Sequence, residues 1–185
     1  RRQAPRAMTA GLAAAVEAVR ARTSLVPEVG VVLGSGLGGF ADAVEESVAI
    51  PYAEIPGWPV STAIGHAGEL VVGRFGGRPI AVMKGRAHLY EGLPPARVVF
   101  GVRVLGALGV HALVLTNACG AVDTSLVPGQ LVAITDHLNL QGSSPLVGPN
   151  DDALGPRFPD LSNAYDPALR AVAHGAAERL GIELG

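Results

Sequence analysis

VGVVLGSGLGG, at residues 29–39, joins a short apolar run to a cluster of glycines. The apolar run, residues 29–33, ends at Gly34, which is typical of a buried strand that feeds a glycine loop. Glycines at such a place let backbone N–H groups crowd around an anion, and the hydroxyl of Ser35 adds a donor. The segment therefore predicts a phosphate-binding loop after a strand, with a mere tight turn as the alternative.

Two strand-like runs farther along the chain predict an antiparallel hairpin. They are Glu69–Phe75 and residues 79–84, and the pair Gly76-Gly77 lies between them. Glycines readily supply the positive φ angles of a tight hairpin turn. A β-hairpin next to a strand and its loop indicates a mixed sheet.

Helical and strand-like segments alternate in the rest of the chain. Helices are expected to start at Thr9, at Pro94-Pro95 and at Asp166-Pro167. Strands are expected at Ala112–Leu115 and at residues 131–135, and residues 139–162 are expected to form a long irregular loop. The fold class that these elements predict is α/β, with a mixed twisted β-sheet flanked by helices.

The bulk composition fits one compact domain over residues 1–185. Hydrophobic residues make up 49% of the chain and charged residues 16%, and the formal net charge is -2. Scattered arginines and a nearly neutral charge predict no nucleic-acid or membrane partner. The lone Cys119 excludes an internal disulfide and fits a cytoplasmic protein. Because the last predicted helix runs almost to Gly185, where a further strand is expected, we predict a domain that is incomplete at its C-terminus.

Gly34, Gly36 and Gly39 also satisfy the G-x-G-x-x-G pattern of dinucleotide-binding folds. Such a fold needs a second parallel strand ending in an acidic residue about 20 residues on. Glu54 stands near that distance, but it lies between Pro51 and Pro56, where a buried parallel strand is not expected. A dinucleotide site is the weaker alternative.

GRAHLYEG, at residues 85–92, follows the second hairpin strand and places Arg86, His88 and Tyr90 at alternate positions. Alternate side chains of an extended segment point to one side. That side would offer a guanidinium fork for phosphate oxygens, an imidazole donor, and a phenol for a sugar or a base. The alternative is a solvated arginine beside two half-buried rings.

Other motifs add a possible lid and a ring-binding loop. His66 stands between small residues in GHAG, and Asn117 follows a predicted strand in a run of small residues that would let a flat ring approach. Asn117 as the cap of a plain turn is the alternative. The five histidines have no metal-ligand spacing, and Ser35 lacks the G-x-S-x-G pattern, so neither a zinc site nor a hydrolase nucleophile is expected.

Five ordered motifs together resemble the trimeric purine nucleoside phosphorylase family. They are VVLGSGLGGFAD, GHAG, GRAHLYEG, VLTNACGAVD and GPNDDALGPRFPDLSNAYD, and the likeness extends over residues 25–170. The resemblance implies a phosphorylase/hydrolase-like three-layer α/β/α fold and a pentosyltransferase of purine salvage. This family splits purine (2′-deoxy)ribonucleosides reversibly with orthophosphate, giving free base and pentose 1-phosphate, and it uses no metal or other cofactor.

The resemblance also implies roles for individual residues. The phosphate-binding residues would be Ser35, His66, Arg86, His88 and Ala118. The nucleoside-binding residues would be Tyr90, Ala118, Cys119, Gly120 and Phe158, and the catalytic residues would be His88 and Asn117. Phe158 would reach the sugar site of a neighbouring subunit, which implies a homotrimer.

Some features of the family are not found in this sequence. The family's purine-reading Glu, an Asn for the departing base and a second phosphate-binding Ser would lie beyond Gly185, and Cys119 replaces a common Ala. Methylthioadenosine phosphorylase, of the same superfamily, is one alternative. A noncatalytic nucleotide-binding module is another, although it does not explain Arg86, His88 and Tyr90 together.

Overall fold

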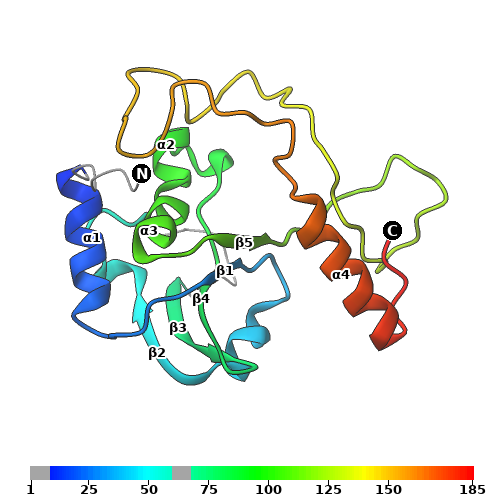
Figure 1. Cartoon of the computed structure of the whole chain (residues 1–185). Helices are drawn as coiled ribbons and strands as arrows, with labels where there is room; N and C mark the ends of the chain where they lie inside the picture. The colour runs from blue at the N-terminus through cyan, green and yellow to red at the C-terminus, as the bar shows by residue number, and fades with distance from the viewer. Residues whose placement is uncertain (1–8, 60–67) are drawn as a thin grey trace. The chain divides into compact units, whose positions relative to one another are not determined.

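The computed structural model describes residues 9–59 and 68–185, so His66 lies outside the described residues. These residues form two compact units, of which unit 1 comprises residues 9–118 and 144–155, and unit 2 comprises residues 119–143 and 156–185. The helices and strands of unit 1 are α1 (Ala10–Arg20), β1 (Val29–Val32), η1 (Gly38–Ala43), β2 (Glu45–Pro51), η2 (Tyr52–Glu54), β3 (Glu69–Phe75), β4 (Arg78–Lys84), η3 (Leu89–Glu91), α2 (Pro95–Val98), α3 (Phe100–Leu108) and β5 (Ala112–Leu115) (Figure 1). Unit 2 contains α4 (Pro167–Leu180).

Unit 1 is built on a five-stranded sheet in the order β2-β3-β4-β1-β5. β1 runs parallel to both of its neighbours, and Val31 pairs with Val82 on one side and Val114 on the other. β3 is antiparallel to β2 and β4. The predicted α/β class with a mixed sheet flanked by helices is therefore confirmed. The carboxyl ends of β4, β1 and β5 lie at one edge of the sheet, and three loops start there.

The hairpin of β3 and β4 forms as predicted, with Gly76 and Gly77 both at positive φ, 55° and 76°. Strand β2, which the sequence analysis missed, lies antiparallel at the edge beside β3 and buries only Ile50. Glu54 belongs to the short 3₁₀ turn that follows β2. Because the parallel strand required after the glycine loop is absent at this place, the dinucleotide alternative is wrong.

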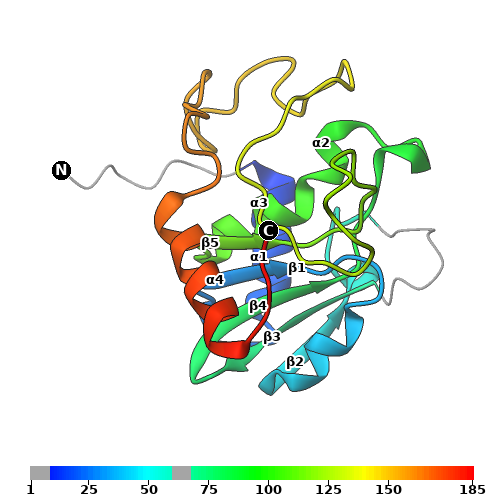
Figure 2. The same ribbon diagram turned by 90° about the vertical axis from the view of Figure 1, so that its right-hand side faces the viewer.

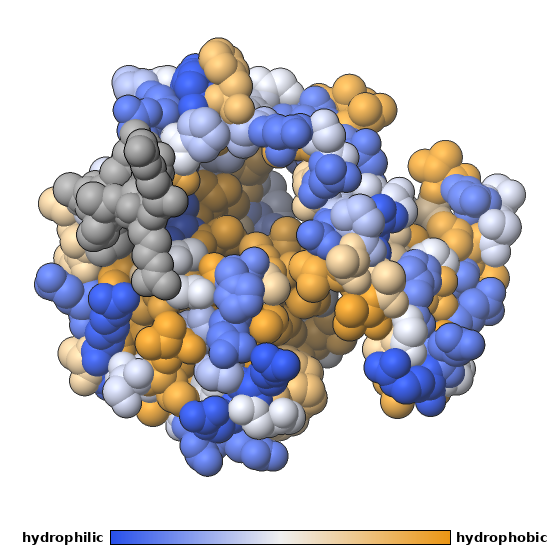
Figure 3. All heavy atoms as spheres, in the orientation of Figure 1, coloured by the Kyte–Doolittle hydropathy of each residue, from blue (hydrophilic) through white to orange (hydrophobic). Residues whose placement is uncertain are grey.

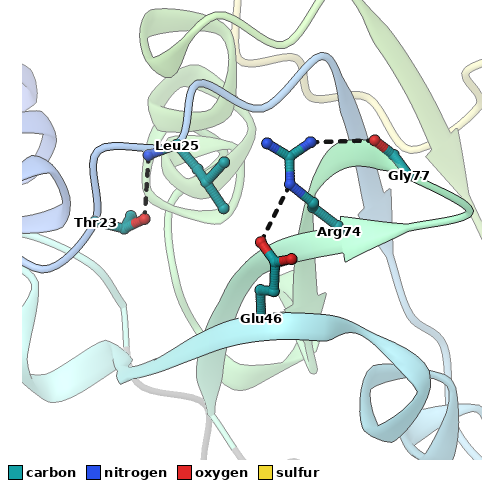
Figure 4. A network of polar contacts seen from close by, with 5 residues as sticks. All are labelled: Thr23, Leu25, Glu46, Arg74 and Gly77. Carbon is teal, nitrogen blue, oxygen red and sulfur yellow. Dashed lines mark hydrogen bonds and ion pairs between the residues drawn. The ribbon is translucent and has the colours of Figure 1, made fainter.

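An irregularity in the pairing of β2 and β3 falls between Glu45 and Val48. Within it, Glu46 adopts a positive φ of 49°, which is uncommon for a residue other than glycine. Arg74 of β3 points toward this bulge, and its Nε lies 3.3 Å from Oε2 of Glu46 (Figure 4). A second nitrogen of Arg74 donates to the carbonyl of Gly77 at 3.1 Å, so one side chain links the bulge to the hairpin turn.

Both faces of the sheet of unit 1 are buried, in two separate clusters. One face packs against α1 and α3, which lie side by side (Figure 2). Its cluster includes Val16, Leu70 and Leu105, each no more than 1% exposed. The other face, with Val71 and Val82, is covered in part by the η1 segment. Successive side chains of β3 and β4 point to opposite faces of the sheet, and both faces are buried, as is typical of central strands.

Two sequence expectations differ from the structure. The helix predicted from Pro94-Pro95 is divided into α2 and α3, because Val99 adopts φ −85° and ψ 0°, outside the α-helical region. The strand predicted at residues 131–135 is wrong. In its place, Leu131 forms a single bridge with Leu184. Within the described residues, the run pairs only through this single bridge. A strand needs a neighbouring strand that pairs with it over several residues.

Unit 2 consists mainly of irregular chain and α4. The side chain of Asp166 caps α4 by accepting hydrogen bonds from the N–H groups of Ala168 and Leu169, at 2.7 and 3.0 Å. Gly181 ends the helix in the left-handed region, at φ 66°. The predicted helix is thus confirmed, and residues 139–162 are irregular as expected. Among the described residues, no helix combines the length and apolarity needed to cross a membrane.

Candidate active site

Three loops of unit 1 start at the carboxyl edge of the parallel strands. They follow β1 at Gly34, β4 at Gly85 and β5 at Thr116. In open α/β sheets, ligands bind at this edge of the strands. All three loops carry residues that the sequence analysis selected, so the fold brings the starts of three separate motifs to one edge.

Thr116 links these three loops by hydrogen bonds. Its hydroxyl accepts from the N–H of Gly34 at 2.7 Å and donates to the carbonyl of Val32 at 3.0 Å. Its own carbonyl accepts from the guanidinium of Arg86 at 2.6 Å. No role was predicted for Thr116. The one feature of the sequence that could have pointed to it is its position as the first polar residue after the apolar run of β5.

The glycine loop has a conformation that only small residues allow. A Cβ on Gly34 would stand 2.9 Å from the carbonyl oxygen of Thr116, and Gly36 adopts φ +83°. The N–H of Leu37 closes the turn on the carbonyl of Gly34 at 3.2 Å. Ser35 lies exposed at the tip of this turn, and its hydroxyl bonds to none of the described residues. The loop therefore presents Ser35 to solvent, where an anion can reach it.

Arg86 and His88 lie on an extended segment, as expected from their spacing. Both are half-buried, whereas Ala87 between them is 5% exposed, so the predicted alternation is observed over these three residues. Tyr90 instead belongs to the η3 turn and is 76% exposed. Its ring stacks on that of His88, with 4.9 Å between centroids and 18° between planes. Glu91 accepts from the N–H of His88 at 2.6 Å and so fixes the start of the turn.

A lysine that had no predicted role lies against the glycine loop. The Cε of Lys84 is 3.7 Å from the point where a Cβ on Gly38 would stand. Its Nζ lies 3.2 Å from Glu69 and 3.6 Å from Asp42. The hydrogen bond to Glu69 raises the pKa of Lys84 above its ordinary value, so the ammonium is charged at neutral pH. The two carboxylates hold the ammonium beside the loop and neutralise its charge.

The remaining predicted residues fall into two sets. Asn117 and Ala118 are exposed at the end of β5 in unit 1. Cys119, Gly120 and Phe158 belong to unit 2, where Phe158 is 85% exposed. The structure therefore brings together the starts of the Ser35, Arg86 and Asn117 segments, and the roles of the other residues stay predictions. Within residues 9–59 and 68–185, no three His, Cys, Asp or Glu side chains cluster as a metal site would require.

The likeness to known proteins covers most of the chain. The family model described as the phosphorylase superfamily matches residues 28–185. Purine nucleoside phosphorylase 1 of Geobacillus stearothermophilus is 51% identical over 158 residues, which cover 85% of this chain and 58% of that protein. Purine nucleoside phosphorylase of Bos taurus is 46% identical over 158 residues, covering 84% of this chain and 55% of that protein. The chain thus spans a little over half the length of these relatives.

Solved structures show the same likeness in three dimensions. The purine nucleoside phosphorylase of Schistosoma mansoni in complex with acetate has a TM-score of 0.88 at 42% identity, covering 94% of this chain and 65% of that one. Isoform 2 from the same organism, in complex with cytosine and ribose-1-phosphate, also has a TM-score of 0.88, at 40% identity, covering 94% and 62%. With the family model matched from residue 28 to residue 185, the chain belongs to the phosphorylase superfamily, and its resemblance to the purine nucleoside phosphorylases within it is confirmed.

Proposed function

We propose that the protein is a purine nucleoside phosphorylase, which splits purine (2′-deoxy)ribonucleosides reversibly with orthophosphate. The observation that carries this proposal is the meeting of Gly34 and Arg86 on Thr116, because it puts the glycine loop and a guanidinium at one strand edge. Relatives named purine nucleoside phosphorylase, at 46–51% identity, support the choice of reaction. They also favour it over methylthioadenosine phosphorylase and over a noncatalytic nucleotide-binding module.

Orthophosphate is the ligand of the site's first half in this proposal. Ser35 and the neighbouring backbone N–H groups hold phosphate oxygens from one side, and Arg86 and His88 hold them from the other. Ala118 adds a backbone N–H, and His66 closes over the anion. No metal or other cofactor is needed for this binding.

The nucleoside occupies the second half of the site. A phosphate oxygen forms a bond to the anomeric carbon of the sugar while the glycosidic bond breaks, and its electron pair leaves with the purine. The phosphate dianion stabilises the positive charge that grows on the sugar, and its fixed position removes much of the entropic barrier. His88 and Asn117 are the proposed catalytic residues.

The contacts to the sugar and the base are proposed from the resemblance to the family. Tyr90 contacts the sugar, and Ala118, Cys119 and Gly120 line the base. The exposed Phe158 reaches the sugar site of a neighbouring subunit in a homotrimer, which would explain a large aromatic ring 85% exposed. The lone cysteine fits a cytoplasmic enzyme, and the net charge of -2 fits small-molecule substrates better than a nucleic acid or a membrane.

The experiment that tests the function is release of base from inosine with and without phosphate. We expect hypoxanthine and ribose 1-phosphate to form only when phosphate is supplied. Equal release of hypoxanthine in phosphate-free buffer would make the protein a hydrolase and overturn the proposal. Adenosine, assayed in parallel, would show the preference between 6-oxo and 6-amino purines.

A further inference from the structure

Tyr52 is a buried tyrosine whose hydroxyl points at the segment that carries Arg86. The hydroxyl donates to the carbonyl of Gly85 at 2.7 Å, and the residue is 1% exposed. Gly85 adopts φ 99°, in the region that favours glycine, directly before Arg86. The bond thus fixes the peptide from which the Arg86 side chain starts.

The ring of Tyr52 has little freedom to move away from this carbonyl. It stacks on Trp58 with 4.7 Å between centroids and 18° between planes. The N–H of Tyr52 donates to the carbonyl of Gly68 at 2.7 Å. Burial, and to a smaller extent the charge of Glu69, raises the pKa of the Tyr52 hydroxyl well above its ordinary value. The hydroxyl therefore stays a neutral donor at every pH at which an enzyme would be assayed.

We infer that Tyr52 is a positioning residue that sets the affinity for phosphate through Arg86. The inference rests on the proposed function. Arg86 is held at two points, since Tyr52 fixes the carbonyl before it and Thr116 accepts from its guanidinium at 2.6 Å. Without the hydroxyl, the carbonyl of Gly85 loses its buried partner and the peptide turns to find another. A shift of about 1 Å in a binding group is enough to weaken its contacts severely.

The first test is Tyr52→Phe in the intact protein, which keeps the ring and removes only the hydroxyl. We expect the KM for phosphate to rise about tenfold, while kcat and the KM for nucleoside change less than about twofold. If Tyr52 served stability alone, the substitution would lower the melting temperature and leave the KM for phosphate unchanged. An unchanged KM for phosphate would overturn the inference.

Val16→Ala is the matched control, because Val16 lies in the same buried cluster, is 1% exposed and belongs to α1. It should lower the melting temperature and leave the KM for phosphate as it was. A double-mutant cycle then tests the link to Arg86. If Tyr52 acts through Arg86, then Tyr52→Phe should have no further effect on phosphate binding in an Arg86→Ala background. A full tenfold effect in that background would contradict the link.

Calorimetric titration with inorganic phosphate separates this inference from the proposed function, because it needs no nucleoside. If the unmodified protein binds phosphate but releases base without it, the proposed function fails, and the Kd of Tyr52→Phe still decides the inference. If Tyr52→Phe binds phosphate as tightly as the unmodified protein, the inference fails and the proposed function stands. A protein that binds no phosphate at all would overturn both.

Discussion

The two compact units bury their apolar residues to very different extents. In unit 1, strand and helix residues such as Leu70 and Leu105 are fully buried on a face of the sheet. In unit 2, Leu138 and Leu140 are 85% and 87% exposed, and Ala177 is the only buried residue. Orange, apolar residues lie at the surface among blue, polar ones on the face drawn in Figure 3. Unit 1 thus has its own hydrophobic core, and unit 2 does not.

The residues with proposed roles also belong to different units. Ser35, Arg86 and Ala118, which are proposed to bind phosphate, follow strand ends that a core and three long-range hydrogen bonds hold in place. Cys119, Gly120 and Phe158, proposed to contact the nucleoside, belong to the unit without a core of its own. Stability is not uniform across a protein, and parts with few buried contacts open most easily. We therefore expect substitutions in the two units to differ sharply.

The largest difference is expected between Leu70→Ala and Leu140→Ala. Leu70 is 0% exposed, so its truncation should lower the free energy of unfolding by about 2–5 kcal/mol. Leu140 is 87% exposed, and its truncation should change that free energy by less than about 0.5 kcal/mol. Urea unfolding followed by the fluorescence of Trp58, the one tryptophan, measures both. Similar losses in the two variants would show that unit 2 is buried in solution.

Arg86→Ala is expected to have the next largest effect, measured in phosphate binding. A hydrogen bond to a charged group is worth about 1.5–3 kcal/mol, so the KM for phosphate should rise by about 10- to 150-fold. The KM for nucleoside should change far less. Arg78→Ala is the control, since Arg78 is the first residue of β4, at the end of that strand farther from Arg86, and pairs with Glu28. A larger rise in the KM for nucleoside than for phosphate would refute the role of Arg86.

A smaller effect is expected from Thr116→Val, which removes the acceptor of the Gly34 N–H without changing the shape of the side chain. A buried donor left without a partner costs about 1–3 kcal/mol, which should appear in the free energy of unfolding by urea. Thr23→Val removes an acceptor of the N–H of Leu25 instead (Figure 4). Because that bond is longer, at 3.2 Å, its loss should lower the free energy of unfolding by less. An equal loss in the two variants would contradict the importance of the Thr116 bonds for holding the loops together.

The smallest effect is expected from Tyr52 in alkaline solution. Its pKa is raised in the folded protein by burial, whereas in the unfolded chain a tyrosine ionises near pH 10. Stability from this group is therefore complete below about pH 10 and falls above it, by about 1.4 kcal/mol per pH unit. Tyr52→Phe should lose stability less steeply over that range in urea unfolding. Parallel curves above pH 10 would mean that the hydroxyl is not buried in solution.

Much of the fold was predictable because the relevant signals are local. The strand and loop at residues 29–39, the hairpin at Gly76-Gly77 and the helix start at Asp166-Pro167 all depend on neighbouring residues, and all three are confirmed. Strand β2 escaped prediction because an edge strand with one buried residue has almost no alternating pattern. The prediction of a strand at residues 131–135 was wrong although the run is apolar. In the described part of the chain, this run forms one isolated bridge and pairs with no strand.

The amino-acid sequence by itself determined which segments are proposed to bind phosphate: the glycine loop with Ser35, and the extended run with Arg86 and His88. Only the tertiary structure decided which residues hold them in place. Thr116 bonds to Gly34 across 82 positions, and Tyr52 bonds to Gly85 across 33. The acceptor in each bond, a hydroxyl in one and a backbone carbonyl in the other, meets its donor only once the sheet has formed. A pattern read along the chain cannot contain such pairs, because distance along the chain says nothing about which strand ends become neighbours.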